Sequence, residues 1–139
     1  MLLIDNSAWA RLASARLDSE RAETVAAWMD DLQLATCLPF LLEAGYSARS
    51  GGERAAMMAD LAKLPRVEID KDIEAAALDA QRELADIGHH RLPPTDVTIA
   101  ACAHMAGVGV LHYDSDYDLL AQRTSLRFES EWLARPGAL

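Results

Sequence analysis

Residues 93–114 have the sequence PPTDVTIAACAHMAGVGVLHYD, which predicts a helix followed directly by a strand. The proline pair precedes Thr95 or Asp96, either of which can cap a helix that should run to about Met105. Because apolar and small residues occupy nearly every position of this helix, we expect it to lie buried near the centre of the fold. Two glycines then favour a turn into a short buried strand over residues 110–112.

The same alternation of short apolar runs and helical segments extends along the chain, without a repeat or a linker. This alternation is typical of an α/β fold, in which helices cover both faces of a mainly parallel sheet. The length of 139 residues suits one domain with its own core, so we predict a single domain over residues 1–139. We expect strands at residues 2–4, 34–36, 67–69, 110–112 and 126–128, a helix soon after residue 7, and further helices at 20–33, 39–49, 53–63, 73–87, 95–105 and 116–122.

The composition is that of an ordinary globular protein, with 51% hydrophobic and 25% charged residues. The apolar run over Met1–Ile4 is far too short for a signal peptide or a membrane span. Cys37 and Cys102 lie in apolar segments without metal-ligand spacing, so we expect both to be reduced core residues. These features predict a cytoplasmic protein that is not bound to a membrane.

The formal net charge of −9 argues against a nucleic-acid partner, because such proteins usually carry a positive surface that binds phosphates. The argument changes if several of the carboxylates are gathered in one place and neutralised by metal ions, which make a site locally cationic. A nucleic-acid partner therefore requires that such a gathering of carboxylates exists in this chain.

Acidic residues stand where two predicted strands end. Asp5 follows the first strand and Asp114 follows the strand at residues 110–112, and ligands of parallel sheets bind outside the carboxyl ends of the strands. Asp96 lies at a helix N-terminus, and Asp116 comes two residues after Asp114. Each of these acids also has a simple structural explanation, as a helix cap or as part of a solvated turn.

Glu43 is harder to explain structurally, because it interrupts an apolar segment that we expect to pack into the core. A buried carboxylate costs several kcal/mol unless it is paired or bound to a metal. Arg49 is six residues away, nearly two helical turns, and no lysine is in reach. Glu43 therefore needs a cation from elsewhere in the fold.

Four or five carboxylates cannot remain ionised side by side without positive charge between them. A set of ligands that are all oxygens selects hard cations, which here means Mg²⁺ or Mn²⁺. Such ions can orient a phosphodiester, acidify an attacking water and stabilise the leaving oxygen, which is nuclease chemistry.

At these residues the chain resembles a PIN domain, and specifically a VapC-type toxin of a bacterial type II toxin–antitoxin pair. The order, spacing and local context of the motifs all agree, over nearly the full length of the chain. The segments that carry the resemblance are Leu3-Ile4-Asp5-Asn6-Ser7-Ala8-Trp9, Leu42-Glu43-Ala44, Pro94-Thr95-Asp96-Val97-Thr98-Ile99-Ala100-Ala101 and His112-Tyr113-Asp114-Ser115-Asp116-Tyr117-Asp118.

The resemblance implies a three-layer α/β/α sandwich and Mg²⁺-dependent endoribonuclease activity, with tRNA as the leading substrate. It also implies a VapB-like antitoxin as partner and a homodimer that can join a larger assembly. The family's acidic residues match five positions of this sequence, and its hydroxyl residue near the first aspartate matches Ser7. Asn6 departs from the pattern, because many members carry Thr there. The five matching acids are Asp5, Glu43, Asp96, Asp114 and Asp116.

The roles within the site follow from the same resemblance. We expect Asp5, Asp96 and Asp114 to be direct metal ligands, whereas Glu43 and Asp116 could ligate the ion, hold a water or accept a proton. We also count Asp116 among the expected metal ligands. Arg91 is a candidate phosphate contact, with a solvated arginine as the alternative. Asp118 is expected to lie outside the site, at the start of the last helix.

Other kinds of protein share parts of this acidic pattern. An EF-hand loop starting at Asp114 fails, because Leu119 replaces its glycine and Ser125 its final glutamate. A phosphate-accepting receiver domain would need a lysine near the last strands, but the only lysines are Lys63 and Lys71. A non-catalytic PIN-like module that binds RNA or a protein stays open, whereas a flap-like DNA nuclease would need a longer chain.

The histidines are not expected to act as ligands. His89 and His90 should be exposed in the loop before the proline pair, and His104 and His112 have no partner at metal-ligand spacing, so packing is their expected role.

Overall fold

The computed structural model describes residues 1–89 and 91–139, so the expectation for His90 lies outside the described residues. Within these ranges five parallel strands form one sheet in the order β3-β2-β1-β4-β5. The strands are β1 (Leu2–Ile4), β2 (Leu34–Cys37), β3 (Arg66–Val67), β4 (Gly109–His112) and β5 (Ser130–Trp132). The helices are α1 (Asn6–Trp9), α2 (Ser19–Asp30), α3 (Leu38–Tyr46), α4 (Gly51–Leu61), α5 (Lys71–Asp86), α6 (Pro94–Ala106) and α7 (Asp116–Arg123).

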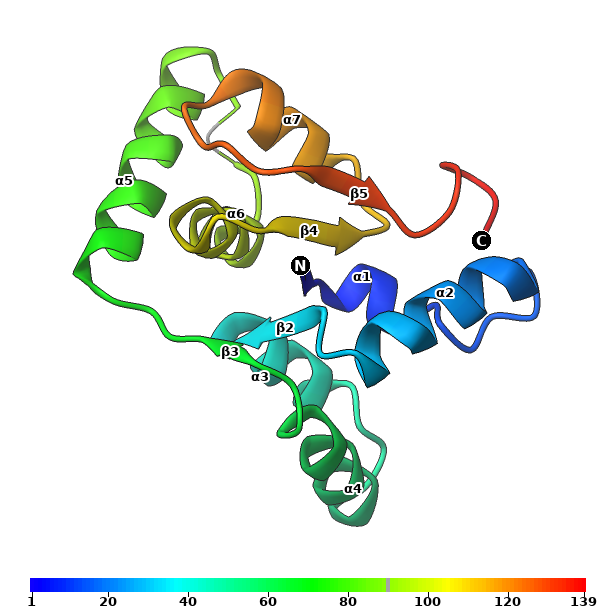
Figure 1. The fold of residues 1–139 in the computed structure, drawn as a ribbon. Helices are drawn as coiled ribbons and strands as arrows, with labels where there is room; N and C mark the ends of the chain where they lie inside the picture. Colours follow the sequence, from blue (N-terminus) through cyan, green and yellow to red (C-terminus); the bar gives the residue numbers. More distant parts are fainter. Residues whose placement is uncertain (90) are drawn as a thin grey trace.

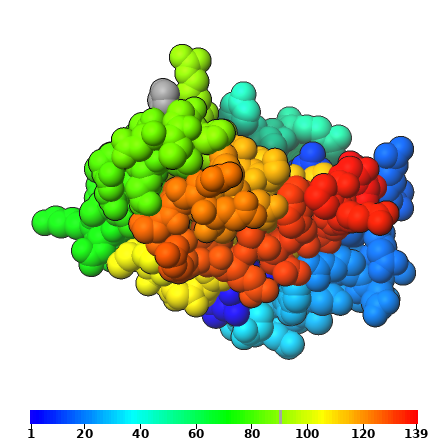
Figure 2. Space-filling model, turned by 90° about the horizontal axis from the view of Figure 1, so that it is seen from above, coloured from blue at the N-terminus to red at the C-terminus, as the bar shows by residue number. Residues whose placement is uncertain are grey.

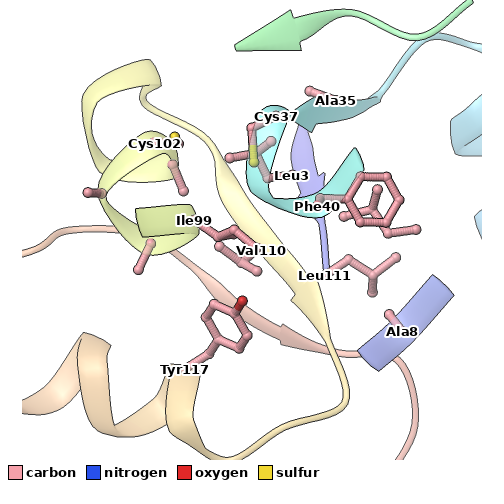
Figure 3. Packing of buried hydrophobic residues seen from close by; sticks show 14 of the residues in the cluster. Leu3, Ala8, Ala35, Cys37, Phe40, Ile99, Cys102, Val110, Leu111 and Tyr117 are labelled. Atoms are coloured by element: carbon pink, nitrogen blue, oxygen red, sulfur yellow. The ribbon is translucent and has the colours of Figure 1, made fainter. Parts of the chain in front are cut away.

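The helices form two groups around the sheet. Helices α5, α6 and α7 pack against one another, and α3 packs against α1 and α4 (Figure 1). The two groups also meet where α3 contacts α6. The two groups contact the central strands from opposite sides: Figure 3 shows Val110 of β4 pointing toward Ile99 and Tyr117, and Leu111 pointing toward Ala8. The predicted α/β/α sandwich with a parallel sheet is therefore confirmed.

Helix α6 is buried as the sequence predicts, because every residue over 99–103 is fully inaccessible to solvent. Pro94 lies in its first turn, where a missing N–H costs nothing, and Gly107 ends it with the positive φ of 67° that glycine tolerates. The helix packs on β1 and β4. Asp96 in its first turn lies close to Asp5, the residue after β1, because the Tyr117 hydroxyl contacts both side chains. The fold thus places Asp96 beside the ends of two strands.

The prediction of a strand over residues 126–128 is wrong, because β5 comes later, at Ser130–Trp132. The Leu126 side chain is buried in the core, and the Arg127 N–H donates to His104 Nδ1 at 2.9 Å instead of pairing with a strand of the sheet. Hydrogen bonding to β4 begins only at Glu129, whose carbonyl accepts from the Val110 N–H at 2.9 Å. Apolar content alone did not distinguish a buried connection from a strand.

The segment that follows β5 lies against the start of α2, and the two are seen as red beside blue in Figure 2. Arg21 joins them, since its guanidinium donates to the Leu133 and Trp132 carbonyls at 3.0 and 2.8 Å and pairs with Glu131 at 2.6 Å. Among the described residues, no helix has both the length and the apolar character needed to cross a membrane.

Candidate active site

The carboxylates converge at one edge of the sheet, where β1 and β4 end side by side. Ile4 and Leu111 are paired in the parallel register, so the residues that follow both strands emerge together. Asp5 follows β1 directly and caps α1, while Asp114 lies in the loop after β4. Asp96 comes from the first turn of α6 and Asp116 from the first residue of α7. The acids that the sequence placed at strand and helix ends thus meet in three dimensions.

Three of them form a compact cluster with the spacing of a metal site. One carboxylate oxygen each from Asp96, Asp114 and Asp116 lies within 4.8 Å of the other two. None of the ion pairs among residues 1–89 and 91–139 involves these three acids. Ligands that are all oxygens and carry no other counter-charge fit a hard divalent cation, since such ions bind carboxylate oxygens at about 2.0–2.6 Å.

Asp5 lies beside the cluster and is held rigidly, with only 3% of its surface exposed. Its Oδ2 accepts hydrogen bonds from the Ser7 N–H at 2.8 Å and from the Ser7 hydroxyl. Its Oδ1 accepts from the Tyr117 hydroxyl at 2.8 Å, and the same hydroxyl lies 3.5 Å from Asp96 Oδ1. Asp5 therefore acts as a helix cap and as a member of the acidic site at once.

The charges of the cluster conflict when no cation is bound. Burial, together with the nearby charges of Asp5, Asp114 and Asp116, raises the pKa of Asp96 to about 8. Burial and the charge of Asp114 likewise raise the pKa of Asp116. A cluster that is forced to keep a proton near neutral pH is one that a divalent cation would stabilise.

Glu43 is less buried than the sequence analysis expected. It is half-buried at the edge of an open hollow of about 400 Å³, because α3 turns only Phe40 and Ala44 fully into the core. On the outer face of the helix Leu42 is 61% and Tyr46 is 91% exposed. The prediction that the whole apolar segment is buried is therefore wrong, since α3 has an exposed apolar side.

The charge of the acidic site nevertheless affects the pKa of Glu43. Its pKa is raised by partial burial and by the charge of Asp5, while a hydrogen bond from the Thr95 hydroxyl works in the opposite direction. It is not one of the acids with metal-ligand spacing among the described residues. The geometry thus separates Glu43 from the compact cluster.

Ser7 links the ends of the two central strands. Its hydroxyl donates to Asp5 and accepts from the Tyr113 N–H at 2.9 Å, so it ties the residue after β1 to the residue after β4. The amide oxygen of the neighbouring Asn6 is buried and has no hydrogen-bond partner among the described residues. Arg91 is exposed and makes no ion pair with another described residue, so no contact brings it to the cluster.

Two further side chains contact the acids of the site. The sequence motifs do not mark Tyr117 as a site residue, although its hydroxyl contacts Asp5 and Asp96. His112 is fully buried, as expected for a packing residue, but its Nδ1 also accepts the Asp114 N–H at 3.1 Å. The Tyr117 contacts depend on where α7 lies relative to β1 and α6, and the His112 contact depends on the conformation of the loop after β4, so no spacing rule in the sequence reveals either one.

Asp118 stands outside the cluster, in the first turn of α7, as predicted. Its two oxygens accept from the Ser130 hydroxyl at 2.6 Å and from the Trp132 indole N–H at 2.9 Å. Ser130 also contacts His112 Nε2 at 2.7 Å. Asp118 therefore joins α7 to β5, and through Ser130 it is linked to His112.

The pattern of the PIN domain family matches residues 2–122, which include all five acids. The chain belongs to the PIN domain family. It is 34% identical over 142 residues to Ribonuclease VapC18 of Mycobacterium tuberculosis, a match that covers 98% of this chain and 97% of the relative. It is also 41% identical over 91 residues to Ribonuclease VapC2 of the same species, covering 63% and 64% of the two chains. Within the family this is thus a VapC-like PIN domain.

Solved structures agree on the fold of this PIN domain. The VapBC complex of Salmonella typhimurium, determined with bound DNA, contains a chain that superimposes with a TM-score of 0.74. The alignment covers 96% of this chain and 100% of that chain at 18% sequence identity. At that identity the likeness concerns the fold, which it supports over nearly the whole length.

Proposed function

We propose that this VapC-like PIN domain is a Mg²⁺-dependent endoribonuclease and the toxin of a type II toxin–antitoxin system. The observation that carries the proposal is the cluster of Asp96, Asp114 and Asp116 beside Asp5, at the edge where β1 and β4 end. The similarity of the chain, over 98% of its length, to a protein named Ribonuclease VapC18 supports RNA as the substrate.

In the proposed mechanism Asp96, Asp114 and Asp116 hold the ion, with Asp5 as a further ligand. A bound Mg²⁺ or Mn²⁺ would orient the phosphodiester, acidify water and offset the charge of the leaving oxygen. Asp5 is held in one orientation by Ser7 and Tyr117, so it needs no rearrangement when substrate arrives.

Glu43 and Arg91 act at the rim of the site in this proposal. Glu43 is half-buried and its pKa is raised, so its carboxylate is suited to accept a proton from the attacking water. Arg91 precedes α6 and is exposed, so its guanidinium is free to contact a phosphate of a bound strand.

The proposed partners follow from the relatives. Solved neighbours of this fold are toxin–antitoxin complexes, which supports a VapB-like antitoxin as the partner that blocks the acidic site. We further propose tRNA as the RNA target, a homodimer within the larger assembly, and a cytoplasmic location.

The test is RNA cleavage by the purified protein with Mg²⁺, with EDTA, and in the variant Asp96→Asn. We expect cleavage of tRNA with Mg²⁺, loss of cleavage with EDTA, and a fall of at least about 100-fold in kcat for Asp96→Asn, because the variant loses a charged ligand. Asp72→Asn is the matched control, since Asp72 also lies in the first turn of a helix but is exposed and is not one of the clustered acids.

Undiminished cleavage by Asp96→Asn would refute the proposed site. Binding of RNA without turnover under all metal conditions would instead indicate a non-catalytic PIN-like module. Cleavage of DNA but not RNA in parallel digests would favour a flap-like nuclease.

A further inference from the structure

Tyr117 places a single hydroxyl directly beneath the acidic site. The residue is completely buried in α7, and Figure 3 shows its ring on the side of β4 that faces Ile99. The hydroxyl donates to Asp5 Oδ1 at 2.8 Å and lies 3.5 Å from Asp96 Oδ1. A phenylalanine would fill the same apolar space, so packing alone does not account for a hydroxyl at this position.

The ring that carries this hydroxyl cannot turn away. It stacks on His112 with ring centroids 4.9 Å apart and planes inclined by 32°. His112 is itself fixed at both nitrogens, because Nδ1 accepts from the Asp114 N–H and Nε2 contacts the Ser130 hydroxyl. The position of the Tyr117 hydroxyl is therefore set by the same strand and loop that carry Asp114.

The hydrogen bonds to Asp5 determine what its carboxylate can still bind. Each carboxylate oxygen has about two lone pairs. At Oδ2 both are taken, by the N–H and the hydroxyl of Ser7. At Oδ1 one lone pair accepts from the Tyr117 hydroxyl, so one lone pair of this oxygen is left to bind a cation. The same hydroxyl also contacts Asp96.

We propose that Tyr117 is a positioning residue whose hydroxyl restricts Asp5 to binding a cation through one oxygen and keeps that oxygen aligned with Asp96. Without the hydroxyl, Asp5 Oδ1 loses the only side-chain donor that the described residues give it, and the two carboxylates lose their common anchor. This inference rests on the part of the proposed function that places a divalent ion at the cluster, and it does not require that the substrate be RNA.

The test compares Tyr117→Phe with wild type by calorimetric titration with Mn²⁺ and by steady-state RNA cleavage. Loss of an outer residue that orients a ligand typically costs 10- to 100-fold in metal affinity or activity. We expect the Kd for Mn²⁺ to rise about 10-fold and kcat to fall about 10-fold, while KM for RNA stays unchanged. Tyr113→Phe is the matched control, because its hydroxyl contacts only Arg135 and Leu139 among the described residues.

A double-mutant cycle separates positioning from general damage to the fold. In the Asp5→Asn background the Tyr117→Phe change should no longer weaken Mn²⁺ binding, because its partner carboxylate is gone. An equal loss of Mn²⁺ affinity in both backgrounds would overturn the proposal, as would wild-type Mn²⁺ affinity in Tyr117→Phe.

The metal titration also keeps this inference separate from the proposed function. If wild type binds Mn²⁺, Tyr117→Phe binds it more weakly and no variant cuts RNA, the ribonuclease proposal fails and the role of Tyr117 stands. If wild type cuts RNA and Tyr117→Phe leaves both Mn²⁺ affinity and kcat unchanged, the role of Tyr117 fails alone. A wild-type protein that binds no Mn²⁺ overturns both.

Discussion

At the level of single residues, the Asp96 carboxylate is destabilised by burial and by repulsion from its acidic neighbours. Its carboxyl is 7% exposed and faces three other acids, so its pKa rises from 3.8 to about 8. In the unfolded chain the same carboxyl is solvated and keeps its ordinary pKa. The folded, metal-free protein therefore binds a proton that the unfolded chain has released.

This difference makes stability depend on pH. Between about pH 4 and pH 8 the folded state holds more protons at Asp96 than the unfolded state, so its free energy of unfolding falls as the pH rises. Asp96→Asn removes this dependence. We expect the variant, in EDTA, to gain stability relative to wild type as the pH rises from about 5 to about 8. Urea denaturation at both pH values measures the difference, and the same difference at both would contradict the assignment.

Glu43 shows the limit of reasoning from single residues. The sequence correctly marked it as an acid in an apolar segment, but its burial was overestimated because the outer face of α3 is itself apolar and exposed. A helix with apolar residues on both sides does not reveal which side faces the core. The packing of α3 on its neighbouring helices and on β2 decides that question.

At the scale of elements, the site depends on how closely β4 approaches its neighbours. Gly109 begins β4, and a Cβ at this position would lie 2.7 Å from Leu2 Cδ2 and 2.8 Å from the Glu129 carbonyl oxygen. The second contact is with backbone, which cannot move without shifting the segment that enters β5. Gly109 thus permits the close approach between β4 and the segment that enters β5.

We therefore expect Gly109→Ala to destabilise the protein by about 1–3 kcal/mol, the usual cost of overpacking. Gly51→Ala is the control, because a Cβ at Gly51 in the first turn of α4 meets nothing within 4 Å. Urea denaturation of both variants checks the expectation. Equal stability of the two variants would show that the strands can shift at no cost.

The connections between elements were harder to predict than the elements. The burial of α6 and the existence of β1, β2 and β4 followed from their apolar patterns. The position of β5 at Ser130–Trp132 did not follow from an apolar pattern. Leu126 and Phe128 pack on the core without forming a strand, and the Arg127 N–H donates to His104. An apolar pattern indicates burial, whereas a strand also requires a partner for its backbone.

At the scale of the whole molecule, the net charge of −9 is concentrated in part at one edge of the sheet. Divalent cations that bind only the folded protein stabilise it, by about 2.7 kcal/mol at a concentration of roughly 100 times Kd. For a domain of this size the gain corresponds to a rise of roughly 5–10 °C in Tm.

We expect Mn²⁺ or Mg²⁺ to raise Tm by this amount and EDTA to reverse the rise, as measured by circular dichroism during heating. NaCl at the same ionic strength tests for general screening and should give a smaller shift. The response should disappear in Asp96→Asn and persist in Asp72→Asn. Equal shifts in all three proteins would place the effect outside the acidic cluster.

The alternation of strands and helices, the burial of α6 and the acids that follow β1 and β4 can be predicted from the amino-acid pattern, because they depend on local sequence and on where parallel strands end. The pattern does not predict that Asp96, Asp114 and Asp116 form the compact cluster, that Glu43 lies at its rim or that Tyr117 donates to Asp5. These contacts join residues far apart in the chain, so they depend on how the helices pack across the sheet, which local pattern does not encode.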